Sequence, residues 1–102
     1  NLPARHVLHT VGPIVAGALT DEDRVLLASC YRSCLSLAAK HGLSSIAFCC
    51  ISTGEFHFPN AAAAEIAVRE VRAFLRENDS IERVVFNVFK DEDRAIYERL
   101  LI

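Results

Sequence analysis

The sequence of 102 residues has no hydrophobic run long enough to cross a bilayer as a helix. Its longest uncharged segments, 11–20 and 43–54, both contain glycine together with proline or serine. Lysine is scarce, with only Lys40 and Lys90, and the arginines are spread along the chain without a basic cluster. Because nucleic-acid binders usually carry such a cluster, and lipid-anchored chains a polybasic or lipidated tail, we expect neither nucleic acid nor a membrane as a partner.

The chain also lacks an initiating methionine and a signal-peptide pattern, since it begins Asn1-Leu2-Pro3. Its length is that of one domain, and a composition of 52% apolar and 24% charged residues is ordinary for a globular chain. Disorder, collagen-like repeats and a coiled coil are therefore excluded. The unusual start raises the expectation that the sequence is a piece of something longer.

Four cysteines are present, and their contexts favour buried free thiols over disulfides. Cys30 and Cys34 lie four apart in a helical pattern, whereas Cys49 and Cys50 are adjacent in a strand pattern and so point to opposite faces. We expect them to pack as small hydrophobic residues in a reduced, cytoplasmic compartment. A disulfide or metal role stays open, although the chain has no Cys-x-x-Cys pair and we expect no metal site within it.

The remaining pattern alternates strands and helices, which predicts an α/β layered sheet. Glycine, proline, asparagine and capping signals divide the apolar periodicities. Thr20 and Asp23 resemble a capping box at the start of one helix, Gly42 is its natural stop, and Asn60 is expected to cap the next helix. The order β-α-β-α-β-α follows, with strands at 5–11, 45–51 and 82–89, helices at 21–41 and from 60 onward, and a last short helix from 91.

The best candidate site is the loop that follows the buried strand, because ligands of such sheets bind outside the carboxyl ends of the strands. Hydroxyls, free amides and a glycine there, followed by a helix N-terminus, make a plausible anion cradle. The alternative is a plain strand-to-helix turn, and Glu55 would repel a phosphate unless it points away. The candidate residues are Ser52, Thr53, Gly54, Glu55, Phe56 and His57.

Aromatic and polar side chains near this edge of the sheet leave further alternatives open. Phe56 and Phe58 either anchor the loop to the core or wall a ribose or base, and a lone loop histidine such as His57 is often only solvated. Asn87 and Phe89 follow the last strand at the same edge, where Phe89 could stack on a base or belong to the core. Ser52 lacks the Gly-x-Ser-x-Gly context of a hydrolase nucleophile.

Taken together, these residues resemble the macrodomain family over nearly the whole chain. The matching segments are NLPAR at 1–5, HTVGP at 9–13, ISTG at 51–54 with the aromatics Phe56 and Phe58, the alanine-rich 61–67, and ERVVF at 82–86. The resemblance implies a three-layer α/β/α fold that binds ADP-ribose, in the branch that removes ADP-ribose from proteins or hydrolyses O-acetyl-ADP-ribose. It places the loop 52–57 on the diphosphate and distal ribose, and Asn87 and Phe89 on the adenine side.

Two departures from the family pattern are Glu55, where many relatives carry an aliphatic residue, and His57, where many carry glycine. The form Ser-Thr-Gly-Glu-Phe is similar to bacterial macrodomains encoded beside sirtuins, some of which use zinc. The resemblance also implies that residues 1–102 are the carboxyl-terminal portion of one macrodomain. The catalytic loop and any zinc ligands would then lie in an amino-terminal half, so no catalytic residue and no cofactor is assigned to this chain.

Three interpretations follow from the resemblance. The parent protein is an ADP-ribosylhydrolase acting on ADP-ribosylated protein, or it is a non-catalytic ADP-ribose or nucleotide-binding module, or the chain is an inactive fragment. The oligomeric state, the acceptor side chain and the general base are not determined by the sequence.

Overall fold

The computed structural model describes residues 12–49, 51, 58–88 and 90–101, and the predicted strand at 5–11 lies outside them. The described elements follow one another as predicted, so the α/β class is confirmed. They are α1 (Asp21–Lys40), β1 (Ser45–Phe48), α2 (Asn60–Glu77), β2 (Arg83–Phe86) and α3 (Asp91–Leu100).

Helix α1 begins at the predicted capping box. The Thr20 hydroxyl accepts a hydrogen bond from the Asp23 amide at 3.1 Å, and the Asp23 carboxylate accepts one from the Thr20 amide at 3.1 Å. Two of the amides that a helix start leaves unpaired are thereby satisfied. The helix ends at Lys40, and Gly42 follows with φ of 71°, a left-handed conformation that glycine adopts without steric cost.

Helix α2 packs against α1. Its buried residues include three alanines near its start, Ala63, Ala64 and Ala67. The prediction that Asn60 caps this helix was wrong, because Asn60 is already its first residue and Pro59 occupies the cap position without a side-chain hydrogen bond. Proline suits this position because its fixed φ is close to the helical value.

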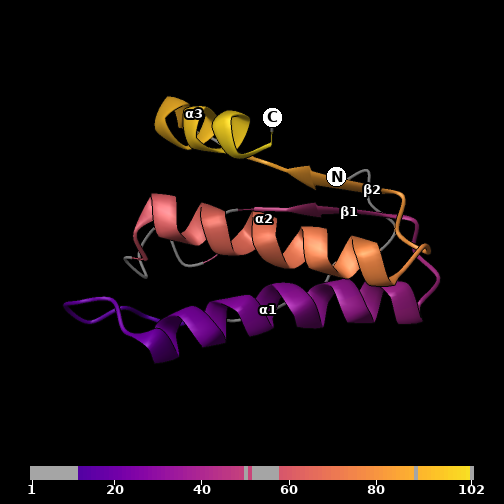
Figure 1. Ribbon diagram of the computed structural model, residues 1–102, viewed down its shortest axis with the longest axis horizontal. Coiled ribbons are helices and arrows are strands. Elements are labelled where there is room, and N and C mark those ends of the chain that lie inside the picture. The colour runs from indigo at the N-terminus through magenta and orange to yellow at the C-terminus, as the bar shows by residue number, and fades with distance from the viewer. Residues whose placement is uncertain (1–11, 50, 52–57, 89, 102) are drawn as a thin grey trace, which may run out of the picture.

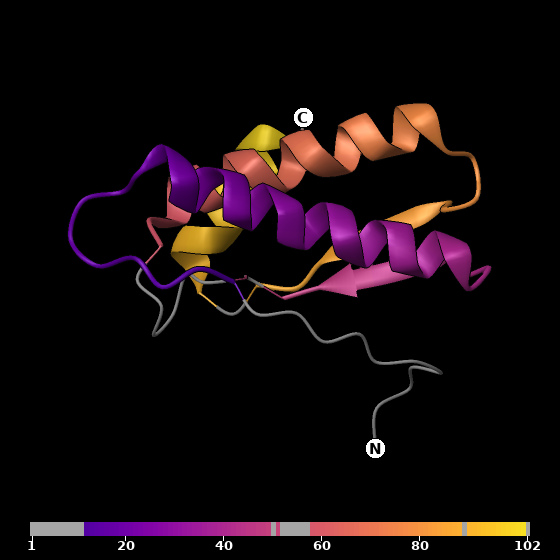
Figure 2. The ribbon, with the colours of Figure 1, turned by 90° about the horizontal axis from the view of Figure 1, so that it is seen from below.

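Strands β1 and β2 pair in parallel, with Ser45 opposite Arg83 and Phe48 opposite Phe86. Each is shorter than its predicted segment. Both point toward the end of the molecule at which the helices begin (Figure 1), and α1 and α2 cover one face of the pair (Figure 2). Parallel pairing across an intervening helix is the arrangement of a βαβ unit, which sets the carboxyl ends of both strands at one edge.

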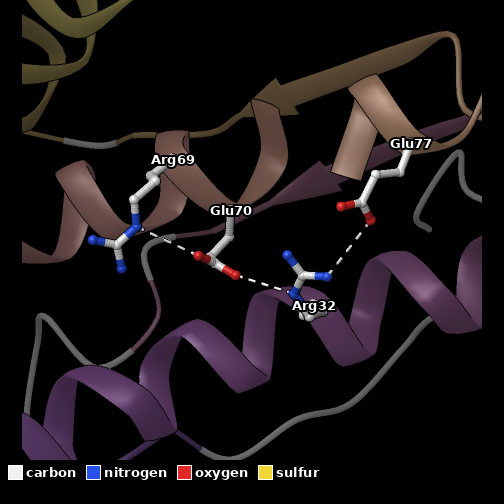
Figure 3. A network of polar contacts seen from close by, with 4 residues as sticks. All are labelled: Arg32, Arg69, Glu70 and Glu77. Carbon is white, nitrogen blue, oxygen red and sulfur yellow. Dashed lines mark hydrogen bonds and ion pairs between the residues drawn. The ribbon is translucent and has the colours of Figure 1, made fainter. Parts of the chain in front are cut away.

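An ion-pair network also joins the two long helices (Figure 3). Glu70 on α2 accepts from Nε of Arg32 on α1 at 3.2 Å and from Nε of Arg69 at 3.4 Å, while Glu77 lies 3.9 Å from Nη1 of Arg32. Glu70 is mostly buried and the arginines are exposed, so the network orients α1 and α2 more than it stabilises them.

The cysteines behave differently from one another. Cys30 and Cys34 are buried, as predicted, but the expectation of burial was wrong for Cys49, which is exposed because β1 ends one residue before it. Burial raises the pKa of Cys34 above its ordinary value of 9.0, and the neighbouring Cys30 and Cys49 raise it further. Cys34 is therefore a packing residue rather than a reactive one.

Among the described residues, no helix combines the length and apolar character that a bilayer crossing requires.

Replacing the cap residue tests the start of α1. The Thr20→Ala substitution should lower the free energy of unfolding by about 1 kcal/mol, because the Asp23 amide loses its acceptor. Urea denaturation measures the change, and Thr20→Ser, which keeps the hydroxyl, should stay close to the parent. Equal stability of the alanine and serine variants would show that the capping box contributes nothing.

Alkylation tests the cysteine environments. Iodoacetamide at about pH 8 should modify Cys49 well before Cys34, because Cys49 is exposed while burial keeps Cys34 out of reach and protonated. Peptide mapping by mass spectrometry measures both rates, and the denatured chain, in which both thiols are accessible, is the control. Equal alkylation rates of Cys34 and Cys49 in the native protein would contradict the assignment.

The raised pKa of Cys34 favours the folded state below pH 9.0, and this contribution to stability is lost as the pH rises further.

Candidate functional site

The carboxyl ends of β1 and β2 meet at one edge, and the candidate residues follow these two ends. The Asn87 amide donates a hydrogen bond to the Phe48 carbonyl at 2.8 Å, so the backbone after β2 continues along the end of β1. Asn87 is exposed at this edge, as the sequence predicted. In open α/β sheets this edge is where ligands bind.

The predicted loop lies between two described anchors. Ile51 is half-buried before it, and Phe58 after it is 1% exposed within the core. Of the two readings offered for Phe58, the core anchor is therefore confirmed. Seven candidate residues lie outside the described part of the chain, and their roles stay predictions: Ser52, Thr53, Gly54, Glu55, Phe56, His57 and Phe89.

The N-terminus of α2, directly after this loop, differs from those of the other two helices. The first turns of α1 and α3 each carry three acidic residues, whereas the first turn of α2 carries none. Helix starts carry partial positive charge and unpaired amides. In α1 and α3 the protein's own carboxylates complement that charge, so α2 is the described helix start best suited to an external anion.

A row of aromatic rings supports the same edge from within. Phe48 and Phe86 are the last residues of their strands, and their ring centroids lie 6.2 Å apart. Tyr31 of α1 lies 4.9 Å from Phe48, and Tyr97 of α3 lies 4.9 Å from Phe86. Offset and tilted contacts of this kind are favourable, so the four rings couple α1, both strands and α3 directly behind the edge.

Sequence reasoning missed two members of this region. Tyr97 was not recognised as a core residue, although it is 7% exposed and lies one position after the predicted apolar Ile96. Asp93, in the first turn of α3, is 8% exposed, which is rare for a carboxylate. The signal for Asp93 was the run Asp91-Glu92-Asp93 after the last strand, which indicates a helix start but not burial. Within the described ranges, no group of three or more side chains is arranged to hold a metal ion.

Comparison with known proteins identifies the family. The Macro domain matches residues 1–67. A protein-ADP-ribose hydrolase of Treponema medium is 57% identical over 99% of this chain, and the ADP-ribose glycohydrolase MACROD2 of Xenopus laevis is 50% identical over 98%. The chain spans 39% of the first relative and 24% of the second, well under half of either length.

Solved structures show the same fold. The Trypanosoma brucei macrodomain in complex with ADP-ribose superposes with a TM-score of 0.89 at 43% identity, covering 99% of this chain and 41% of that one. The Oceanobacillus iheyensis macrodomain with ADP gives 0.83 at 43% identity, covering 91% of this chain and 48% of that one. With the sequence identities above, these similarities show that the chain belongs to the macro domain family.

Proposed function

We propose that the protein containing this chain binds ADP-ribose, and that it hydrolyses mono-ADP-ribose from proteins or hydrolyses O-acetyl-ADP-ribose. The observation that carries the proposal is the 57% identity, over 99% of the chain, to a protein named as a protein-ADP-ribose hydrolase. A macrodomain with 43% identity and bound ADP-ribose supports the ligand. The alternative, a binding module without turnover, is less well supported because the similar relatives are named as hydrolases.

In this proposal the ligand lies along the carboxyl edge of the sheet. The loop Ser52, Thr53, Gly54, Glu55, Phe56 and His57 holds the diphosphate and the distal ribose, and the uncharged start of α2 adds amides and a favourable dipole. Asn87 and Phe89 contact the adenine side, where the exposed position of Asn87 is compatible with the role. Preorganised amides aimed at the diphosphate lose little energy to reorganisation when the ligand binds.

For a modified protein, the chemical step in this proposal is attack of water on C1″ of the distal ribose. The new bond from C1″ to the water oxygen forms as the bond from C1″ to the acceptor atom breaks, and the proton that the water loses leaves with the released acceptor. Binding holds the ribose and the attacking water in a fixed relative orientation, and this accounts for a large part of the lowering of the activation barrier. No residue of this chain is assigned as the general base. In this proposal, residues 1–102 hold neither a metal ion nor an organic cofactor.

We also propose that residues 1–102 are the carboxyl-terminal portion of one macrodomain, acting in the bacterial cytoplasm. The chain covers 39% of the Treponema medium relative and 41% of the Trypanosoma brucei structure. This partial coverage supports the assignment to a portion of one macrodomain. The thiols of Cys34 and Cys49, which are not in disulfides, support a reducing compartment. The intact mass of the natural gene product tests the domain assignment, since a mass near 11.3 kDa would overturn it.

Calorimetry tests ligand binding. ADP-ribose titrated into the full-length protein should bind, and Gly54→Val should weaken binding at least about tenfold, about 1.4 kcal/mol, because a branched side chain blocks close approach of the backbone to phosphate. The control Ser36→Val places the same side chain on the exposed face of α1 and should bind as the parent does. Absence of binding at millimolar ADP-ribose would refute the proposal.

Turnover separates the enzyme from the reader. The full-length protein should release ADP-ribose from a mono-ADP-ribosylated protein, measured by chromatography of the freed nucleotide. Gly54→Val should reduce release in proportion to the lost binding, whereas Ser36→Val should not. Tight binding without any release would favour the non-catalytic module.

A further inference from the structure

An open groove of about 390 Å³ lies between α2 and α3, and the candidate site does not use it. Val68 and Leu100 contribute its apolar lining, and three arginines and one glutamate contribute its polar lining. The six lining residues are Glu65, Val68, Arg69, Arg72, Arg76 and Leu100.

The arginines form a regular row along α2. Arg69, Arg72 and Arg76 are exposed at positions i, i+3 and i+7, so they lie on one side of the helix over about two turns, roughly 10 Å. Val68 beside them is 4% exposed and lies in the core. Three exposed charged side chains therefore lie beside a buried apolar one.

The charge of this row is largely uncompensated. Arg72 donates through Nη2 to the Leu100 carbonyl at 2.9 Å, which holds the guanidinium against the end of α3, and no carboxylate of the described residues pairs with it. Among the described residues, Arg76 has no ion pair, and Arg69 shares Glu70 with Arg32. Like charges four residues apart on a helix repel each other, so an anionic partner would relieve a repulsion that the free protein retains.

We infer that this groove binds an acidic amphipathic helix of a partner protein. A helix lying along the surface of the groove would place carboxylates, spaced three and seven residues apart, opposite the three arginines, and an apolar side chain on the half-buried Leu100. Arginine pairs with carboxylates through two parallel hydrogen bonds, which gives the row directional specificity.

Glu65 and the apolar lining disfavour a nucleic acid as the occupant. A phosphate backbone would meet the Glu65 carboxylate one turn before Arg69, and the groove offers no aromatic ring on which a base could stack. For a peptide, Glu65 instead sets the orientation, because a basic residue of the partner pairs with it at that end. The inference is independent of the proposed ADP-ribose site, which lies at the carboxyl edge of the strands.

Fluorescence anisotropy tests the inference with the full-length protein and a labelled peptide of about 16 residues, long enough to form a helix. The peptide carries glutamates at the stated spacing, leucines on the adjacent face and one terminal lysine. It should bind, and binding should weaken as the salt concentration rises from about 0.05 M to about 0.2 M. Replacing its glutamates with glutamine should weaken binding by about tenfold or more.

Matched variants locate the binding surface. The Arg69→Gln/Arg76→Gln variant keeps the Arg72–Leu100 contact and should bind the peptide about tenfold more weakly. The Arg24→Gln/Arg83→Gln control removes the same charge from exposed positions on α1 and β2 and should change binding by less than about twofold. Arg76→Gln alone, at a residue with no ion pair in the described part of the chain, tests the row without disturbing Glu70.

Four outcomes would overturn the inference: no peptide binding, equal loss in both double variants, undiminished binding of the glutamine peptide, or preferential binding of a DNA oligonucleotide or polyphosphate. Self-association that Arg76→Gln abolishes would also overturn it, since a second copy of the chain would then fill the groove. Both double variants should bind ADP-ribose as the parent does, so failure of the groove and failure of the proposed function give different results.

Discussion

The parallel pairing of β1 with β2 is the interaction on which the rest of the described structure depends. Its register sets Phe48 beside Phe86, so the last side chains of both strands lie in contact and both chains leave the sheet at the same edge. The hydrogen bond from Asn87 to the Phe48 carbonyl extends that pairing by one residue beyond the strands. Any displacement of the register would separate the two segments that carry the candidate site residues.

The helical layer follows from that pairing. A parallel pair needs a crossover, and α2, which also packs on α1, supplies it. The aromatic row of Tyr31, Phe48, Phe86 and Tyr97 joins the outer helices to the strand ends. As a result, packed aromatic side chains support the edge that receives the ligand in the proposed function, as preorganised binding requires.

The sequence predicted most of the elements and little of their detail. The capping box of α1, the glycine at its end and the order of strands and helices depend on local patterns, and these were correct. The cap of α2 was misplaced by one residue, because asparagine and proline are both compatible with a helix start. Cys49 was expected inside because its apolar run continues beyond the strand, whereas the pairing with β2 ends at Phe48.

By itself, the sequence determined the α/β class, the family resemblance and the loop in which to look for an anion, since these follow from periodicity and from motifs of adjacent residues. Only the tertiary structure decided which aromatic rings meet behind the edge, and that the arginines of α2 share a groove with Leu100 of α3. These features join residues far apart in the chain. Their proximity depends on strand register and helix packing, which no local pattern specifies.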